Sequence, residues 1–374
     1  MNTVRQLLQF KGDQVWTTEK SSTVLDAMQI MSEKHVGGLV VMDNDEVVGI
    51  FTERDHARLS DVLANLRHAR KLGTRFVDFT GGEPTLHEEL PTMLEEAKRL
   101  NYKTSVTTNC LRYVRESENL KGLVDFLHFS LDGLSAKKHD QIRGQRSFVH
   151  VMHSIDRARD LGESPDLLFT VNEENLDHLE PCIDFAQAIG FVLIVNPIFS
   201  YSFISSPEPN ILKRIERYAS SPFVYVNKAF HQLRRSGGNS TTAPRCRVMD
   251  STIVISPDNK IVVPCYHFQQ LNLSLHEHAN MDDLKDLKSW RRSFAWKYYQ
   301  KNQGRFKFCQ GCHLNCYFDP SFFYKVDSYF WQSLLAKSRY WRDKYIRKKM
   351  PGSKFEKRPA IDIAAEIMGQ YDSI

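Results

Sequence analysis

The chain has 374 residues, 41% of them hydrophobic and 25% charged, which is enough for two or three compact units with a sizeable core. The net charge of +5 comes from no dominant basic run, so we expect no nucleic-acid partner. No apolar run reaches roughly 18 residues, and residues 1–11 lack the apolar core of a signal peptide, so we expect neither a secretory leader nor a membrane span and predict a cytoplasmic protein.

The first segment reads as a strand at 13–17, a helix at 23–34 and two strands at 38–42 and 47–52. Apolar residues recur at helical spacing behind a cap at Ser22 or Thr23, and short polar side chains at 43–45 favour a turn between the two later strands.

This order, with the sequences at 35–41 and 49–55, resembles a single CBS repeat over about residues 3–60. The resemblance implies that Thr52 and Asp55 contact the ribose and phosphate of an adenine nucleotide. The alternative is that Thr52 starts a helix whose positive N-terminal end favours Asp55. Because CBS repeats work in pairs and the chain shows one, a complete cleft requires a second chain, which predicts a homodimer through this segment.

From Asp55 the chain continues with helical periodicity to Gly73, with no linker before it. Apolar strands and striped helices then alternate, which predicts a parallel sheet wrapped by helices, that is, a partial β/α barrel. The expected strands are 76–80, 103–107, 126–130, 166–171 and 192–197, and the expected helices are 90–100, 149–161 and 176–189.

Polar motifs follow these strands. Gly81-Gly82-Glu83-Pro84 has two glycines that permit close approach of a ligand and a carboxylate that can hold an amine; the alternative is a tight turn. The motifs that follow, in chain order, are 107–109, 130–133 and 139–144.

Together these motifs resemble the SAM-binding half of the radical S-adenosylmethionine (SAM) family. The resemblance implies that Gly81, Gly82 and Glu83 hold the methionine amino group, that Ser130 contacts the methionine or ribose portion, and that Asn196 lies near the adenosyl end. We place Asn109 and Asp132 in the same cofactor-binding set. Cys110 stands where the family usually has glycine.

One departure from the family concerns its Cys-x3-Cys-x2-Cys motif, whose three thiolates fix a 4Fe-4S cluster and leave one iron open for SAM. No cysteine precedes Cys110. We therefore expect SAM cleavage to be impaired or lost unless another chain supplies ligands.

Five of the seven cysteines lie near the C-terminus, at Cys246, Cys265, Cys309, Cys312 and Cys316. A hairpin expected over 251–264 would bring the first two together, and in a reducing compartment this set predicts a closed metal site of zinc or iron-sulfur type. The region resembles the SPASM or twitch extension of radical SAM enzymes, which implies one auxiliary 4Fe-4S cluster. Which four of the five cysteines are ligands stays open.

After Asp327, aromatic residues alternate with basic ones. This pattern fits either a helix lying on an anionic membrane surface, and hence a weak peripheral membrane contact, or a packed terminal helix with a solvated basic face.

The sequence thus predicts an α/β protein with a CBS-like repeat (1–60), a truncated radical SAM (β/α) barrel (61–235), a SPASM/twitch-like cluster domain (236–325) and a basic aromatic tail (326–374). The predicted function is that of a radical SAM/SPASM-type iron-sulfur protein with impaired SAM cleavage and an unidentified small-molecule or peptide substrate. The alternatives are a non-catalytic adenine-nucleotide-binding regulator with a structural metal site, or a recombined gene product.

Overall fold

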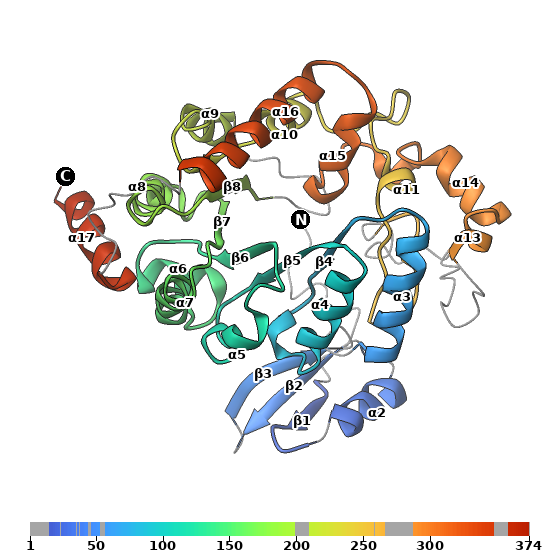
Figure 1. The fold of residues 1–374 in the computed structure, drawn as a ribbon, viewed down its shortest axis with the longest axis horizontal. Helices are drawn as coiled ribbons and strands as arrows, with labels where there is room; N and C mark the ends of the chain where they lie inside the picture. Colours follow the sequence, from blue (N-terminus) through green and yellow to red (C-terminus); the bar gives the residue numbers. More distant parts are fainter. Residues whose placement is uncertain are drawn as a thin grey trace.

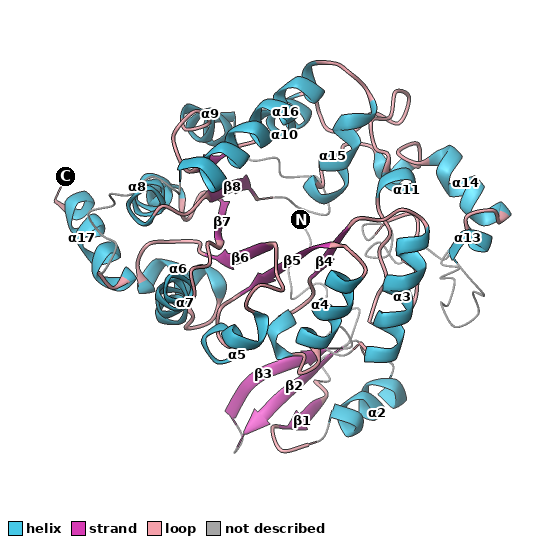
Figure 2. Cartoon of the chain, in the orientation of Figure 1, coloured by secondary structure: helices cyan, strands magenta, loops and turns pink. Residues whose placement is uncertain are grey.

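The computed structural model describes residues 15–22, 24–34, 36, 38–43, 46–52, 57–198, 209–257, 259–265, 287–347 and 358–373. Among them are a small N-terminal sheet, a larger parallel sheet wrapped by helices, and a helical C-terminal region that lies over one end of the larger sheet (Figures 1 and 2). None of the described helices is both long and apolar enough to span a bilayer.

The N-terminal sheet has the order β1-β2-β3, with β1 parallel and β3 antiparallel to β2. Its elements are β1 (Thr17–Glu19), α2 (Val24–Lys34), β2 (Gly38–Asp43) and β3 (Glu46–Thr52). Ala27 and Met31 of α2 pack against Leu39 of β2, as the apolar spacing predicts. The first strand was predicted too early: Thr17 and Thr18 pair with Val40 and Val41, and residues 13 and 14 lie outside the described residues.

Helix α3 (Leu59–Lys71) belongs to the barrel as much as to the N-terminal unit. Its Leu66 packs with Ala97 and Tyr102, and the Tyr102 hydroxyl donates to the Leu66 carbonyl at 2.7 Å. The helix ends at Leu72, and Gly73 follows with a φ of 92°, where glycine is favoured. The predicted stop at Gly73 is confirmed.

The large sheet is parallel, with the order β4-β5-β6-β7-β8-β9. Its strands are β4 (Phe76–Phe79), β5 (Lys103–Thr108), β6 (Phe126–Ser130), β7 (Asp166–Val171), β8 (Leu193–Pro197) and β9 (Val224–Tyr225). The five predicted strands are confirmed, and β9, only two residues long, was not predicted. In the described part of the chain β4 pairs with β5 alone, so the barrel is partial, as expected.

Helices cover the outer face of this sheet (Figure 1). They are α4 (Leu90–Arg99), α5 (Tyr113–Leu120), α6 (Ala136–Arg143), α7 (Phe148–Asp160), α8 (Leu179–Ile189), α9 (Pro209–Arg217) and α10 (Lys228–Arg235), with short 3₁₀ turns η2 (Pro84–Leu86) and η3 (Leu176–His178). The predicted helix 176–189 is divided into η3 and α8. Helices α5, α6, α9 and α10 were not predicted, because they are short and carry few apolar residues.

One hydrophobic core lies between the sheet and its helices, with Phe129, Phe169 and Phe185 essentially without solvent exposure. A second core lies mainly in residues 236–325, here called the Cys-rich unit, where it includes Trp290, Trp296 and Phe318. It also contains Phe230 and Leu233 of α10. The unit contains α11 (Val248–Ser251), α13 (Leu287–Trp290), α14 (Phe294–Asn302), η5 (Lys307–Cys309), α15 (Asn315–Ser321) and η6 (Phe322–Tyr324). The expected hairpin 251–264 is shorter than predicted: residues 248–251 are helical, and pairing is limited to the neighbourhood of the Ile255–Ile261 bridge.

The C-terminal region consists of α16 (Ser328–Trp341), the π-helical turn η7 (Arg342–Ile346) and α17 (Ala360–Asp372). Helix α16 packs against α10 and β9, whereas α17 packs against α7 and α8 (Figure 1). Tyr340 and Lys344 bind the buried Asp166 carboxylate at 2.7 and 2.6 Å. The region is therefore packed against the barrel, although one face of α16 stays exposed with Trp331, Leu335 and Trp341.

Candidate functional site

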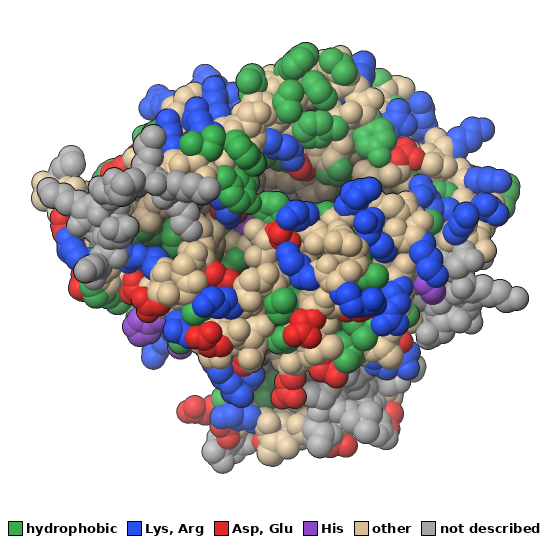
Figure 3. Space-filling view, viewed as in Figure 1, with side chains coloured by type: hydrophobic (Ala, Val, Ile, Leu, Met, Phe, Trp, Pro, Cys, Tyr) green, Lys and Arg blue, Asp and Glu red, His purple; other side chains and the backbone are tan. Residues whose placement is uncertain are grey.

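The predicted SAM-binding residues lie at the ends of parallel strands β4, β5, β6 and β8, at one edge of the sheet that we call the barrel mouth. Figure 3 shows the molecule hollowed between the α15–α16 side and the β4–β6 side. In open parallel sheets, ligands bind at the carboxyl ends of the strands.

Glu83 links the loops that follow β4 and β5. One carboxylate oxygen accepts from the Thr85 amide at 3.1 Å and the Thr85 hydroxyl at 2.6 Å, and the other accepts from the Asn109 amide at 2.7 Å. Gly81 and Gly82, just before it, are exposed. The carboxylate is therefore fixed in orientation beside an open glycine pair.

Asn109 and Cys110 form the turn after β5. The Asn109 side-chain oxygen accepts from the Leu111 amide at 3.0 Å, and Cys110 adopts a φ of 70°, a conformation that favours glycine. This explains why the related family usually has glycine at this place. The Cys110 thiol is buried, and burial raises its pKa, so it packs as a small apolar group.

Asp132 lies inside the protein just after β6. Its carboxylate accepts from the Thr170 amide at 2.8 Å and pairs with Arg143 at 3.2 Å, while its own amide donates to Nδ1 of His139 at 3.1 Å. Burial raises the pKa of Asp132 and lowers that of His139 to about 4. Asp132 thus joins β6, β7 and α6, whereas Ser130, 6% exposed, ends β6 at the mouth.

Asn196 is the last residue but one of β8, and its side-chain oxygen accepts from the Asn315 side-chain amide at 3.1 Å. On another side of the Cys-rich unit, the Asn65 amide of α3 donates to the Asn259 side-chain oxygen at 2.8 Å. The Cys-rich unit therefore contacts both α3 and β8.

The predicted nucleotide-binding pair is described only in part. Thr52 is the last residue of β3, and its side chain lies outside the described residues, as does Asp55 altogether.

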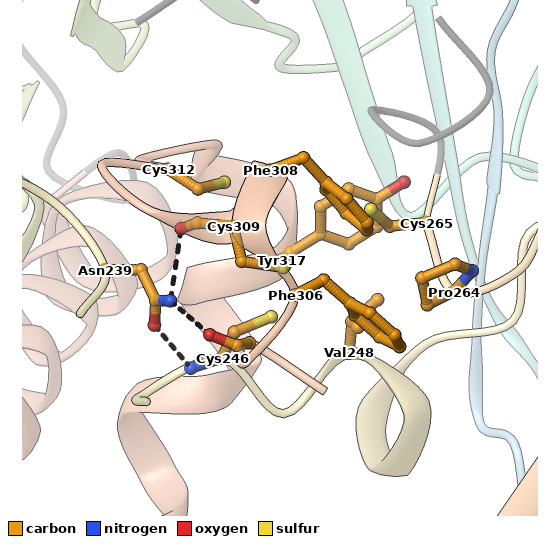
Figure 4. A pocket seen from close by; sticks show the side chains of 11 residues that line it. Asn239, Cys246, Val248, Pro264, Cys265, Phe306, Phe308, Cys309, Cys312 and Tyr317 are labelled. Carbon is orange, nitrogen blue, oxygen red and sulfur yellow. Dashed lines mark hydrogen bonds between the residues drawn. The ribbon is translucent and has the colours of Figure 1, made fainter. Parts of the chain in front are cut away.

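Four cysteines line one cavity in the Cys-rich unit (Figure 4). They are Cys246, Cys265, Cys309 and Cys312, and the other lining residues are Asn239, Val248, Pro264, Gly304, Phe306, Phe308 and Tyr317. The fifth, Cys316, is exposed and does not line it. Four of the five predicted ligands therefore line the cavity, and Cys316 lies outside its lining but close enough to interact electrostatically with Cys246 and Cys265.

Burial controls the charge of three of these thiols. It raises the pKa of Cys246 and Cys312 well above the ordinary range and that of Cys309 to about 12. The thiols are therefore neutral at pH 7 until a metal displaces their protons. Among the described residues, no three His, Cys, Asp or Glu side chains converge closely enough to hold a single metal ion.

Asn239 connects the two cysteine-bearing segments and was missed from the sequence. Its side-chain amide donates to the carbonyls of Gly304 at 2.8 Å and Cys309 at 3.2 Å, and its oxygen accepts from the Arg245 amide at 3.0 Å. Its backbone amide donates to the Cys312 carbonyl at 2.8 Å. The only sequence signal was its place after Gly237-Gly238, a turn-forming pair.

The cavity fits an iron-sulfur cluster in the chemistry of its donors: four thiols from three stretches of the chain, among apolar and aromatic side chains. Four thiolates can also bind zinc, but among the described residues no three such side chains converge on one point.

Comparison with known proteins identifies two segments. The family model for the radical SAM superfamily matches residues 47–186, and the CBS domain model matches residues 12–55. The radical SAM match begins within β3 and ends within α8. It overlaps the CBS match over residues 47–55, which include most of β3.

Two similar proteins are described as probable GTP 3',8-cyclases. That of Saccharolobus solfataricus is 32% identical over 176 residues, covering 44% of this chain and 56% of the relative, and that of Saccharolobus islandicus is 31% identical, covering 42% and 53%. The chain thus spans about half the length of the curated relatives it matches.

Solved structures with a similar arrangement include Streptococcus suis SuiB bound to S-adenosylmethionine and anSMEcpe with bound AdoMet and a peptide. SuiB has a TM-score of 0.49 at 16% identity, covering 76% of this chain and 72% of SuiB. The anSMEcpe complex has a TM-score of 0.49 at 15% identity, covering 87% and 94%. Residues 12–55 of this chain are therefore similar to the CBS domain family, and residues 47–186 are similar to the radical SAM superfamily.

Proposed function

We propose that this chain is an iron-sulfur protein of the radical SAM/SPASM type that holds one auxiliary 4Fe-4S cluster and binds SAM, but does not cleave it unaided. The observation that carries this proposal is the gathering of Cys246, Cys265, Cys309 and Cys312 around one cavity. A cluster bound there would supply one-electron redox chemistry.

The protein's own contribution at this cavity is positioning. Asn239 holds the segments of Cys246 and Cys309 together, which fixes the cysteine backbones before a metal arrives. Phe306 and Phe308 exclude water from one side. Exposed Cys316 is left outside the ligand set.

At the barrel mouth, Glu83 supports SAM binding because its carboxylate, already oriented by three donors, retains acceptor capacity for an amine. Ser130 and Asn196, with Gly81 and Gly82, complete the proposed SAM-binding set, and Asn109 and Asp132 hold the surrounding turns in place.

The sequence supports the proposed loss of SAM cleavage. In these 374 residues no cysteine precedes Cys110, so this chain offers no three-thiolate site ahead of β4 for a cluster with an open iron.

The test is iron and sulfide content after anaerobic reconstitution, with EPR spectra of the reduced protein before and after SAM. We expect about four irons and a spectrum that SAM does not change. Cys312→Ala should lose most of the iron, whereas the matched variant Cys316→Ala should keep it.

Three outcomes contradict parts of this proposal. Zinc in place of iron would contradict the proposed cluster. Equal iron loss in both cysteine variants would contradict the assignment of the ligands. About eight irons with a SAM-dependent spectrum would show that a second, open cluster forms.

A second candidate function is adenine-nucleotide binding by the CBS segment, with the metal site serving structure alone. The match of residues 12–55 to the CBS family favours it. Nucleotide binding without any cluster would support this regulator.

A further inference from the structure

A buried arginine lies beside the barrel mouth. Arg234 of α10 is 4% exposed, and its Nη2 donates to the carbonyl of Pro197, the last residue of β8, at 3.2 Å. Its Nε and Nη1 have no acceptor in the described part of the chain. Three of the five N–H donors of this guanidinium are therefore unused.

The neighbouring charges do not neutralise it. The Glu216 carboxylate accepts from Nδ1 of His231 at 3.0 Å and pairs with Arg235 at 2.7 Å. Burial lowers the pKa of Arg234 to about 10, with no carboxylate offsetting that effect, so the side chain still carries its charge at pH 7. A buried cation without a counter-ion is costly, and proteins rarely retain one.

The surroundings of Arg234 belong to the mouth. Its acceptor Pro197 follows Asn196, whose side chain is bonded to Asn315 of the Cys-rich unit. The side-chain oxygen of Asn315 is buried and has no donor in the described residues. Unused donors and an unused acceptor thus lie on residues bonded to the last two residues of β8, at the edge of the sheet where ligands bind.

We propose that Arg234 binds an oxyanion, a carboxylate or phosphate group carried by the molecule that occupies the barrel mouth. The guanidinium presents its donors in a rigid fork that matches such groups. This inference rests on the proposed use of the mouth as a binding site, and it adds that the ligand is an anion.

The experiment uses the full chain and two probes, potassium phosphate and potassium acetate, with ionic strength matched by potassium chloride. Thermal unfolding and isothermal titration are measured for the wild type, Arg234→Met, Arg234→Lys and the control Arg235→Met. The control removes the same charge from the next residue of α10, whose side chain is 43% exposed.

We expect one of the probes to raise the unfolding temperature of the wild type and Arg235→Met, and to bind Arg234→Met at least tenfold more weakly. Arg234→Lys should bind with intermediate affinity, because it keeps the charge but not the fork. Without a probe, Arg234→Met should unfold at or above the wild-type temperature, because the buried charge is gone. A response to phosphate alone assigns a phosphate-bearing ligand, and a response to acetate alone assigns a carboxylate.

Unchanged binding in Arg234→Met, or no response of the wild type to either probe, would overturn the proposal. So would a lower unfolding temperature of Arg234→Met without anion, combined with an unresponsive wild type, since that indicates a structural role. Iron content is measured on the same samples: iron without an anion response rejects only the oxyanion site, and an anion response without iron rejects only the proposed cluster.

Discussion

At the scale of single residues, Gly238 lies directly against Gly311, the residue before Cys312. A Cβ on Gly238 would lie 2.2 Å from the Gly311 carbonyl oxygen, and its φ is 79°. Gly237, the preceding residue, has a φ of 82° but nothing within 4 Å of its Cβ position. The two glycines have nearly the same φ and differ in the room that their surroundings leave for a Cβ atom.

Gly238→Ala should therefore destabilise the protein by at least about 3 kcal/mol and lower its iron content, because the loop before Cys312 must shift. Gly237→Ala should cost only about 1 kcal/mol, the strain of the backbone conformation alone. Chemical denaturation and iron analysis measure both. Equal effects of the two substitutions would show that the close approach is unimportant.

At the level of residues, the sequence predicted which side chains could act together but not which of them are in contact. The cysteine spacing predicted a metal site, but it cannot separate exposed Cys316 from the four cysteines that line the cavity. Asn239 and Arg234 are of residue types that are usually exposed. The role of Asn239 becomes visible only from its burial and hydrogen bonds, and that of Arg234 only from its burial and unpaired donors.

At the scale of elements, α16 and η7 show how a basic segment can be part of a core. Burial works to raise the pKa of Asp166, but hydrogen bonding to His128 and the charge of Lys344 outweigh it, so that pKa lies below its ordinary value. The Lys344 side chain is 6% exposed. No sequence pattern distinguishes this lysine from its solvated neighbours, because its partner is 178 residues away.

Lys344→Met should lower the free energy of unfolding at pH 7 by about 3 kcal/mol, because it leaves the buried Asp166 carboxylate without its cation. A carboxyl with a depressed pKa stabilises the fold above about pH 4, and that stabilisation is lost as the pH falls further. In the variant the pKa of Asp166 rises, so its deficit should shrink between pH 7 and pH 4 as the carboxyl is protonated. Urea unfolding at several pH values tests this.

The matched control is Lys337→Met on the same helix. Lys337 pairs with Asp319, and both side chains are more than a third exposed, so the loss should stay below about 1 kcal/mol at every pH. A deficit of Lys344→Met that is independent of pH would argue against a charge effect. The aromatic face of α16 is exposed, which is compatible with the predicted membrane contact but does not test it.

At the scale of the whole molecule, one CBS segment is joined to a barrel that it does not complete. The resemblance to CBS repeats implies that these repeats act in pairs. Two copies of the chain should therefore associate through residues 12–55. Light scattering should give twice the chain mass of 43.4 kDa.

The same dimer should bind AMP, and Asp55→Ala should weaken that binding by tenfold or more, since its carboxylate is predicted to contact the ribose or phosphate. Ser130→Ala, at the barrel mouth, is the control and should leave AMP affinity unchanged. A monomer, or an Asp55→Ala protein with wild-type affinity, would reject the regulatory reading of the N-terminal segment.

The order of the strands was easier to predict than the short elements and the contacts between units. Strands β4 to β8 were readable because buried parallel strands are continuous apolar runs. Helix α6 is mostly polar and β9 has two residues, so neither carries a periodic signal. The contacts of the Cys-rich unit with Asn65 and Asn196 depend on residues more than 100 positions apart, which spacing along the chain does not encode.

Helix α3 has a consequence for synthesis on the ribosome. It packs against α4, which follows closely, but also against α13, which begins at residue 287. At ordinary elongation rates those later residues emerge roughly 10 to 40 s after the helix itself. The side of α3 that packs against α13 therefore stays uncovered for more than half of translation, until the last quarter of the chain is made, and during that time it can associate with other nascent chains.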